Sequence, residues 1–395
     1  MKKRKKIKRK KQKKEPLLEK PAETALYFGF QNIKTPEIGK SDIKLAKDIR
    51  KGTDSEGQDE LFELEEKVRI LKLYSEEMKA YPQHHFFFYK KSNHGKALKR
   101  PPGSHEYVLD VLGSPRGITE AIIIQTAFSI LSEEGFTELS VSLNSMGDKE
   151  STAQLEKNLA AFYRKKIESM PATCRQLFKK DIFEIVRSTD EKCAETVKDA
   201  PASLASLSDP ARAHFKEVLE SVEALGIPYT IDGHLYANPL YASHTVFEMR
   251  GKNESGKEAV LGSGYRYNHL TKKIGIKKDI PAIGVVLSWK RDKKSAEKRA
   301  SKAKFYFIQL GFAAKLKSLS VIELLRKAGI LVVHSLTKDK YVGQAGTAEN
   351  MKLPYVLIFG QKEAIENTVV VRDTKTRFQD TVPLSYLTTY LKKLP

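Results

Sequence analysis

The sequence predicts an α+β body built on an antiparallel sheet, with a helical insertion, followed by a smaller α/β domain at the C-terminal end. Strand patterns occur in several short segments between residues 85 and 143 and again between 227 and 289. Residues 150–225 show only helical patterns. From residue 305 onward strand and helix patterns alternate, which is typical of an α/β domain with a mostly parallel sheet.

Apolar spacing places the first elements of the body. We expect a helix over residues 22–28, a turn at Gly29 and a strand that ends at Pro36. Residues 39–60 are polar and charged, and we expect a loop there. The next helix is expected over residues 61–78, where apolar residues recur at helical spacing.

The middle of the body shows further signals. Two apolar runs separated by Lys, Gly and Pro predict an antiparallel strand pair with a long loop: HHFFFYKK and HEYVLDVLG. Residues 117–134 are apolar nearly all round a helix, so this helix should be buried, and a strand should follow over residues 137–143. Further along, a basic, helix-like segment, KRDKKSAEKRASKAK, connects the body to the C-terminal domain.

These elements divide the chain into four parts. Residues 1–16 form a basic tail, which self-repulsion should keep disordered. The body spans residues 17–292, with the insertion at about 150–225, and residues 293–304 form the basic linker. The C-terminal α/β domain spans residues 305–395, an ordinary length for a domain.

The charge balance favours a polyanionic partner. The formal net charge is +21, and eleven of the first fourteen residues are Lys or Arg. Without these eleven charges the rest of the chain still carries about +10, and a basic body of this size favours nucleic acid. The alternative is that the tail only keeps the protein soluble, since long blocks of like charge are usually disordered arms.

Composition also argues against several classes of protein. No apolar run approaches the roughly 18–20 residues that cross a bilayer, and the charged N-terminal residues lack the apolar core of a secretory signal. The two cysteines, Cys174 and Cys193, have no CxxC spacing and no histidine cluster, so neither a metal site nor a disulfide framework is expected. A reducing, cytoplasmic location is the default.

Six short segments resemble motifs of one known family and follow one another along the chain in the same order as those motifs. Residues 211–248 contain GIPY followed by YANPLYASHTVFE, and resemble a helix ending in G-I-x-Y that leads into L-V-R-G-L-D-Y-Y-x-R-T-V-F-E. The other segments are YFGFQNIKTPEI, VLDVLGSPRGITEAIII, LNSMG, GSGYRYNHL and AIGVVLSWKR. Together they resemble the histidyl-tRNA synthetase family of class II aminoacyl-tRNA synthetases. In this resemblance YFGFQNIKTPEI corresponds to motif 1, VLDVLGSPRGITEAIII to the end of motif 2 and the helix after it, and AIGVVLSWKR to motif 3. The region that begins YVGQAGTAENMKLPYVLIFG resembles the class IIa anticodon-binding domain, so the resemblance runs from Glu19 to the C-terminus.

The resemblance implies a class II synthetase-type sheet domain, a homodimer formed through motif 1 (YFGFQNIKTPEI) and neighbouring strands, and binding of ATP, Mg²⁺, histidine and tRNA. Forming an aminoacyl adenylate builds negative charge on the phosphoryl oxygens of ATP, so the site needs fixed cations. Arginine suits this role, because its planar guanidinium binds phosphate bidentately and stacks on adenine.

The two arginine-bearing motifs are only partly kept. Arg291 stands where the motif 3 arginine belongs, although it is also one charge in a basic linker. In motif 2 lysines replace the arginine, at Lys90 and Lys91, and lysine gives up the fork geometry. Glu106 stands where the family has the glutamine that reads histidine.

The family-specific motif is more strongly altered. Its catalytic arginine aligns with Ala237, while Tyr241 keeps the first tyrosine. Arg266 and Tyr267 keep the R-Y of the segment GSGYRYNHL. Glu65 aligns with the glutamate that holds the substrate α-amine, although a charged helix face is the simpler interpretation.

These replacements predict that adenylation is lost or altered. Losing one transition-state donor typically lowers the rate by about 10²–10³-fold, and three or more such losses fall in this one site. Apolar or small residues such as Ala237, together with the large Trp289, fit a filled pocket as well as a reshaped one.

RNA binding does not need the lost residues, because phosphate contacts come from Lys and Arg, and base recognition comes from loops and stacking. The candidates lie in the linker and the C-terminal domain: Lys290, Lys293, Lys294, Gln344, Arg372 and Arg377. For the two arginines a solvated loop pair is an equal interpretation. The sequence thus predicts a non-catalytic relative that binds tRNA or another structured RNA. The alternatives are a divergent but active histidine–tRNA ligase and a regulatory subunit of another enzyme.

Overall fold

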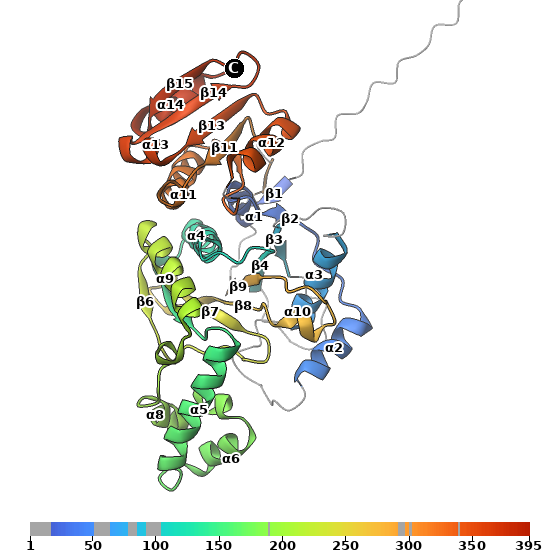
Figure 1. The fold of residues 1–395 in the computed structure, drawn as a ribbon, viewed down its shortest axis with the longest axis vertical. Helices are drawn as coiled ribbons and strands as arrows, with labels where there is room; N and C mark the ends of the chain where they lie inside the picture. Colours follow the sequence, from blue (N-terminus) through green and yellow to red (C-terminus); the bar gives the residue numbers. More distant parts are fainter. Residues whose placement is uncertain are drawn as a thin grey trace, which may run out of the picture.

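The computed structural model arranges three parts of the chain one after another (Figure 1). The C-terminal domain, in orange and red, lies at one end, the sheet of the body lies in the middle, and the helical insertion lies at the other end. The described residues are 17–50, 64–77, 85–91, 104–188, 190–290, 297–299, 302–338 and 340–395. The expected tail over residues 1–16 lies outside them, as do Arg291, Lys293 and Lys294.

An eight-stranded sheet forms the body, which confirms the predicted antiparallel architecture. Among the described strands of this sheet, the interior pairs are antiparallel, and only the edge strands β2 and β6 run parallel to their neighbours. The strand order is β2, β3, β4, β9, β8, β7, β5 and β6. In that order the strands span Gln31–Asn32, His85–Lys90, Ser104–Leu112, Ala282–Lys290, Glu258–Arg266, Ser243–Lys252, Thr137–Ser145 and Tyr229–Ile231.

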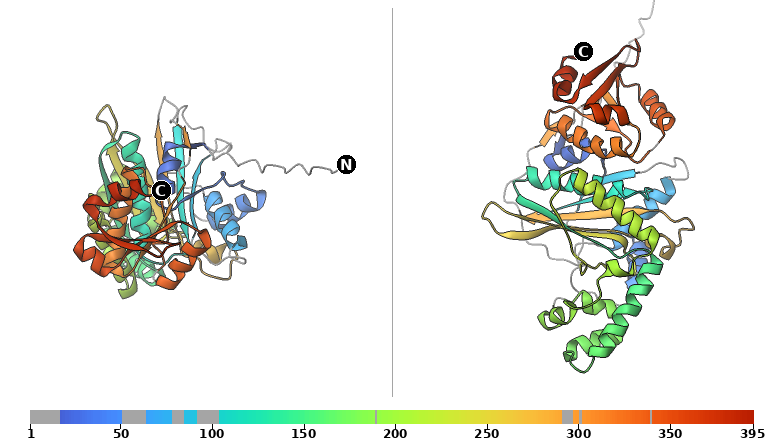
Figure 2. Two further views of the ribbon diagram at one scale, coloured as in Figure 1. Left: turned by 90° about the horizontal axis from the view of Figure 1, so that it is seen from above. Right: turned by 60° about the vertical axis from the view of Figure 1, so that its left-hand side comes forward.

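Helices cover both faces of this sheet. One face, here called the α4 face, packs against α1 (Lys20–Tyr27), α4 (Ile118–Glu133) and α9 (Asp209–Ala224), and Figure 2 shows the green and yellow-green helices lying across it. The other face, the α3 face, packs against α3 (Leu64–Glu77) and α10 (Leu270–Lys273). Successive strand residues point to opposite faces, so β3, β4 and β9 supply alternate residues to two apolar clusters. No helix in the described ranges is both long and apolar enough to span a bilayer.

The loop predicted over residues 39–60 is wrong in its first half, where the structure has helix α2 (Lys40–Arg50). The Asp42 carboxylate of this helix accepts hydrogen bonds from the Gly39 N–H at 2.9 Å and from Lys72 Nζ at 2.7 Å. Polar and charged residues form a helix here because their partners lie on α3, which the local sequence does not reveal.

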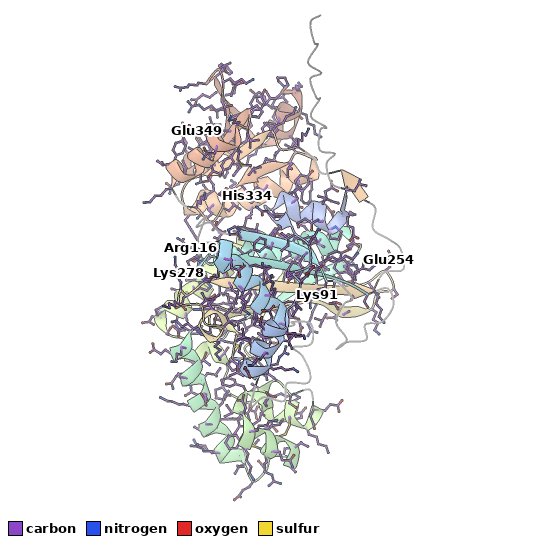
Figure 3. All side chains as sticks on the ribbon, turned by 90° about the vertical axis from the view of Figure 1, so that its right-hand side faces the viewer. Lys91, Arg116, Glu254, Lys278, His334 and Glu349 are labelled. Atoms are coloured by element: carbon purple, nitrogen blue, oxygen red, sulfur yellow. A yellow bond between two sulfur atoms is a disulfide. The ribbon has the colours of Figure 1, made fainter. Side chains whose placement is uncertain are left out.

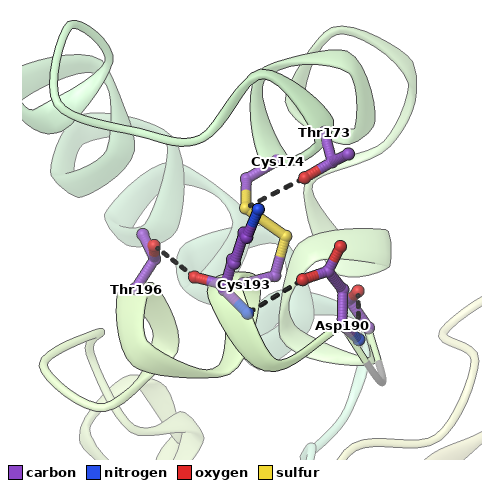
Figure 4. The surroundings of a disulfide bond; sticks show 7 residues. Thr173, Cys174, Asp190, Cys193 and Thr196 are labelled. Carbon is purple, nitrogen blue, oxygen red and sulfur yellow. Dashed lines mark hydrogen bonds between the residues drawn. A yellow bond between two sulfur atoms is a disulfide. The ribbon is translucent and has the colours of Figure 1, made fainter.

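The insertion is helical, as predicted, and contains a disulfide that was not expected. Its helices are α5 (Lys149–Lys166), α6 (Ala172–Lys180), α7 (Ile182–Val186), α8 (Glu191–Val197) and the short 3₁₀ helix η2 (Ser203–Ser206). Cys174 of α6 is bonded to Cys193 of α8, with the two Cα atoms 5.7 Å apart (Figure 4). The prediction of unlinked cysteines is wrong because helix packing joins residues 19 apart in the chain, a spacing that belongs to no motif considered.

The sheet of the C-terminal domain is mixed rather than mostly parallel. β11 is parallel to β12 and β13, whereas β14 is antiparallel to β13 and β15. A parallel crossover needs about a dozen residues, and only residues 360–367 separate β13 from β14. Strands β11 to β15 span Phe305–Gln309, Val332–His334, Tyr355–Phe359, Thr368–Asp373 and Gln379–Pro383. Helices α11 to α14 span Phe312–Lys327, Tyr341–Met351, Gln361–Glu366 and Leu384–Lys393.

Part of the basic linker, residues 297–299, forms a strand. β10 (Glu297–Arg299) pairs antiparallel with β1 (Leu17–Glu19). The predicted helix-like linker is therefore wrong over these residues, because pairing with a segment from the other end of the chain decides the local structure.

Glu133, the last residue of α4, joins the body to the C-terminal domain. Its carboxylate accepts a hydrogen bond from Thr24 Oγ1 at 2.9 Å and binds the Arg326 guanidinium of α11. Lys20 Nζ donates to the backbone carbonyl of Glu133 at 2.7 Å. One residue thus holds α1 and α11 against the end of α4.

A partly buried histidine forms a second contact between the two domains (Figure 3). His334 Nε2 donates to the Tyr27 carbonyl oxygen at 3.3 Å. The ring lies against Gly29, which adopts φ 88° at the predicted turn, and a Cβ added there would be 3.2 Å from the ring. Burial lowers the pKa of His334 to about 4, so the imidazole is neutral at neutral pH.

Candidate functional site

Five charged side chains are buried together on the α3 face of the sheet. They come from α3, from β4 and from the residue that follows β3: Glu66, Lys67, Lys91, Glu106 and Asp110. We call this group the buried charge cluster. Because an isolated ion is costly to bury, the stability of such a group depends on opposite charges and hydrogen bonds within it.

A close ion pair joins Lys67 to Asp110 in this cluster. Lys67 Nζ lies 2.6 Å from Asp110 Oδ1, and the two side chains are 1% and 0% exposed. The Tyr267 O–H donates to the same carboxylate oxygen at 2.8 Å. Lys67 Nζ also lies 5.5 Å from the centre of the Tyr267 ring. Three elements, α3, β4 and the segment after β8, therefore meet at one carboxylate.

Sequence periodicity explains why these two side chains meet. Lys67 lies three residues after Leu64 and four before Leu71, on the buried stripe of α3. Asp110 alternates with residues such as Leu109 that face α4, so its own side chain faces α3. Neither residue is among the predicted candidates, although a lysine on an apolar stripe and an aspartate inside VLDVL are signals for them.

Gly284 of β9 provides space for the ion pair. It lies opposite Asp110 in the β4–β9 ladder. A Cβ at this position would overlap Asp110 Oδ1 and would lie 2.8 Å from Lys67 Nζ. The close approach of the ion pair therefore requires the absence of a side chain here.

Burial also changes the titration of these groups. It lowers the pKa of Lys67, against the opposing effect of the Asp110 charge. It raises the pKa of Tyr267 well above its ordinary value, and the Asp110 charge adds to this. The tyrosine therefore keeps its proton and acts as a hydrogen-bond donor to the carboxylate.

The structure separates the two motif 2 lysines. Lys91, labelled within the body in Figure 3, joins the buried charge cluster, with Nζ 3.4 Å from a Glu66 oxygen and 3.9 Å from a Glu106 oxygen. Lys90 points to the α4 face, where its Nζ lies 2.8 Å from Glu19 Oε1. Consecutive residues of an extended chain point to opposite faces, so Lys90 does not join the candidate pocket.

The large side chains that pack on the α3 face are not the ones expected from the sequence. Trp289 lies on the α4 face, where its ring stacks on Tyr107 with centres 5.2 Å apart. On the α3 face Tyr241 packs against Tyr265, with ring centres 5.6 Å apart, and Ala237 belongs to the same apolar cluster. Tyrosines rather than the tryptophan therefore fill the space beside the buried charge cluster.

Arg266 is held by a carboxylate on the other side of the sheet. Its Nε and one terminal nitrogen donate to the two Glu120 oxygens at 2.6 and 2.7 Å. It also donates to the Ser114 and Arg116 carbonyl oxygens at 3.0 and 3.1 Å. Glu120 further binds His214 Nε2 at 2.8 Å. Arg266 is thus part of the packing between β8 and α4 and does not reach the cluster.

Glu65 also lies apart from the other predicted pocket residues that gather on the α3 face. Its carboxylate binds the Arg50 guanidinium of α2, with the closest nitrogen at 2.8 Å. The following two residues of α3, Glu66 and Lys67, are the ones that face the sheet. Of the eight predicted pocket residues, the structure therefore brings together Lys91, Glu106, Tyr267 and Tyr241 on one face, leaves Lys90, Arg266 and Glu65 outside, and does not describe Arg291.

The RNA-binding candidates differ in accessibility. Gln344 is fully buried, and its amide nitrogen donates to the Gln309 carbonyl oxygen at 2.8 Å. It therefore ties α12 to β11 and offers no group to a ligand. Lys290 is exposed at the end of β9. Arg372 is half-buried in β14, and Arg377 is exposed in the turn that follows.

The β14–β15 turn presents an aromatic side chain that sequence reasoning missed. Phe378 is 65% exposed beside Arg377, which adopts φ 61°. The Asp373 carboxylate accepts hydrogen bonds from the backbone N–H groups of Thr376 and Lys375, both at 2.8 Å, and these bonds lower its pKa. The turn is thus an ordered loop that carries two cations and an exposed ring.

Comparison with known proteins gives consistent matches. Residues 304–394 match the family model of the anticodon binding domain. A histidine–tRNA ligase of Bacillus licheniformis is 28% identical over 295 residues, which cover 73% of this chain and 69% of that protein. One of Fervidobacterium nodosum is 23% identical over 400 residues, covering 95% and 93%. The crystal structure of apo S. aureus histidyl-tRNA synthetase covers 94% of this chain and 93% of its own, at 19% identity and a TM-score of 0.48.

Proposed function

Because this chain belongs to the histidyl-tRNA synthetase family, we propose that it binds tRNA or another structured RNA and no longer forms histidyl-adenylate. The observation that carries the proposal is the buried Lys67–Asp110 ion pair, closed by Tyr267, in the place where the resemblance puts the amino-acid pocket. We further propose a cytoplasmic homodimer, as the family resemblance implies.

The described residues do not fit ATP, Mg²⁺ and histidine together. Adenylation needs cations that can reach phosphoryl oxygens, but Lys67 is bound by Asp110 and Arg266 by Glu120. Lys91 has its side chain fully buried beside two carboxylates. The carboxylates that a hard cation such as Mg²⁺ would need are the same ones that neutralise these lysines. No step of adenylation is therefore assigned to these groups.

The surface of the C-terminal domain supports the RNA half of the proposal. Exposed bases of structured RNA stack on aromatic rings and guanidinium planes, and phosphates bind Lys and Arg. The β14–β15 turn offers all three groups at consecutive or nearby positions: Lys375, Arg377 and Phe378. This turn lies in the region that matches the anticodon binding domain.

Purified protein is expected to give no histidine-dependent exchange between ATP and pyrophosphate. The physical reason is that the buried lysines of the described site, Lys67 and Lys91, lie against carboxylates inside the fold and that Ala237 replaces the family-specific arginine. The assay measures label transfer from pyrophosphate to ATP, with the histidine–tRNA ligase of Bacillus licheniformis as the active control. Robust exchange by this chain would overturn the proposal and favour the alternative, a divergent but active ligase.

RNA affinity is expected to depend on two contributions that can be measured separately: the charge of residues 1–14 and base stacking on Phe378. Deleting residues 1–14 should flatten the dependence of log K on log salt, because fewer counterions are released. Phe378→Ala should weaken binding by about 1–3 kcal/mol, the typical effect of one stacked base, and should leave the salt slope unchanged. Filter binding with tRNA at several salt concentrations measures both quantities.

Phe312→Ala is the matched control for this test. Phe312 is also exposed, at 41%, but it starts α11 rather than the turn, so its loss should leave RNA affinity unchanged. No retention of RNA at low salt would exclude the binding function. Co-purification of a stable partner enzyme in place of RNA would favour the second alternative, a regulatory subunit.

A further inference from the structure

We propose that Lys67 is a tethered ligand, whose ammonium group occupies a preformed site for a primary ammonium ion. The site consists of the Asp110 carboxylate, the hydroxyl and ring of Tyr267, and the space that Gly284 leaves. The inference rests on the proposed loss of adenylation, since a working pocket would have to admit a substrate where the lysine lies.

The acceptor side of this site is built without Lys67. The Tyr267 O–H holds the Asp110 carboxylate through a 2.8 Å hydrogen bond, and the β4–β9 ladder holds Asp110 opposite Gly284. These three residues belong to the sheet or to the segment that directly follows one of its strands, whereas Lys67 arrives from α3, which packs on the sheet. Removing the lysine side chain beyond Cβ therefore leaves an oriented carboxylate facing the vacated volume.

The geometry selects a compact cation rather than a planar one. Asp110 Oδ1 accepts from both Lys67 and Tyr267, and the ammonium lies 5.5 Å from the centre of the tyrosine ring. A cation within about 6 Å of an aromatic ring is attracted by the electrons of its face. Arg266 at Glu120 shows the contrasting arrangement, in which two nitrogens meet two carboxylate oxygens as a fork.

The length of the missing segment defines the ligand. Lys67→Ala removes three methylene groups and the ammonium, which together correspond to n-propylammonium. We expect this ion to bind the variant in the place of the lost side chain. Shorter ions such as methylammonium should bind more weakly because they bury less apolar surface.

The test is a thermal unfolding series on the full-length Lys67→Ala protein in n-propylammonium chloride. The melting temperature should be lower than in the wild-type protein, and it should rise with n-propylammonium and reach a plateau, because the ion binds only the folded state. Sodium chloride and n-propanol at equal concentrations should not reproduce the rise. The wild-type protein should not respond, since its site is occupied.

Three variants keep the result interpretable. Lys67→Met fills the volume without a charge and should not respond to the amine. Lys67→Ala with Asp110→Asn keeps the volume but lacks the carboxylate, and it should not respond either. Lys315→Ala makes the same truncation at another buried lysine, in α11, and reports any general effect of the amine on the protein.

The proposal can be tested even if the Lys67→Ala protein folds poorly. If Lys67→Ala is not soluble alone, its refolding yield with and without n-propylammonium replaces the melting temperature, and a yield that the amine does not raise overturns the proposal. An equal response of Lys67→Ala and the double variant also overturns it. Pyrophosphate exchange by the wild-type protein tests the proposed function separately, so a failure of this inference can be distinguished from a failure of the proposed function.

Discussion

Glu120→Gln is expected to destabilise the protein by about 3–5 kcal/mol, the usual effect of removing one partner of a buried ion pair. The Glu120 carboxylate is fully buried and holds both nitrogens of the Arg266 fork as well as His214 Nε2. Glutamine keeps the shape but leaves the guanidinium charge unbalanced in the interior. Chemical unfolding followed by fluorescence or circular dichroism measures the change in free energy.

The pH dependence of stability gives a second measure of the same interaction. Burial alone would raise the pKa of Glu120, but the charges of Arg266 and His214 lower it from 4.5 to about 2. A carboxyl group whose pKa is lowered by folding contributes stability that is fully present above pH 4.5 and is lost as the pH falls toward 2. The wild-type melting temperature should therefore fall more steeply across this window than that of Glu120→Gln.

Glu195→Gln is the matched control for this prediction. Glu195 pairs with Lys198 on the surface, where both side chains are at least two-thirds exposed. Exposed pairs of this kind contribute about 0–1 kcal/mol, so the control should melt close to the wild-type temperature. Equal stabilities of the two glutamine variants would contradict the assignment of Glu120 as the anchor of Arg266.

Gly284→Ala is expected to cost about 3–5 kcal/mol, because the new Cβ would push apart the buried ion pair. The added atom would overlap Asp110 Oδ1 and crowd Lys67 Nζ. The same unfolding measurement applies. In an Asp110→Ala background the glycine substitution should cost much less, and a double-mutant cycle measures this coupling.

Gly343→Ala provides the matched control within the same chain. Gly343 lies in α12, and a Cβ added there meets no heavy atom within 4 Å. Alanine should stabilise this helix by up to about 1 kcal/mol. A loss of stability at Gly284 no larger than the change at Gly343 would mean that the ion pair has room to move.

Local patterns in the sequence predict most elements of the fold. Strand patterns identify β3, β4, β5 and β9, and the segment over residues 117–134, which is apolar nearly all round a helix, identifies the buried helix α4. The errors occur where distant partners decide the structure. Lys72 of α3 helps to stabilise α2, and β1 converts part of the basic linker into a strand. Neither partner is visible within the segment concerned.

The candidate site is harder to predict, because its residues meet only after folding. The two-residue period of a strand could have separated Lys90 from Lys91, and the helical stripe could have singled out Lys67. By contrast, the partner of Arg266 is Glu120, 146 positions earlier in the chain. An alignment to a family shows which motif position a residue occupies. It does not show which residue pairs with its charge, because packing in three dimensions brings that partner close.

The disulfide of the insertion links α6 to α8 covalently, in addition to the backbone between them. Cys174 and Cys193 lie on different helices, so the backbone between them forms a closed ring with the sulfur atoms. A protease that cuts within this ring produces two segments that stay joined through sulfur. The insertion then remains in one piece until a reductant opens the bond, so its tolerance to cleavage depends on the redox state of its surroundings.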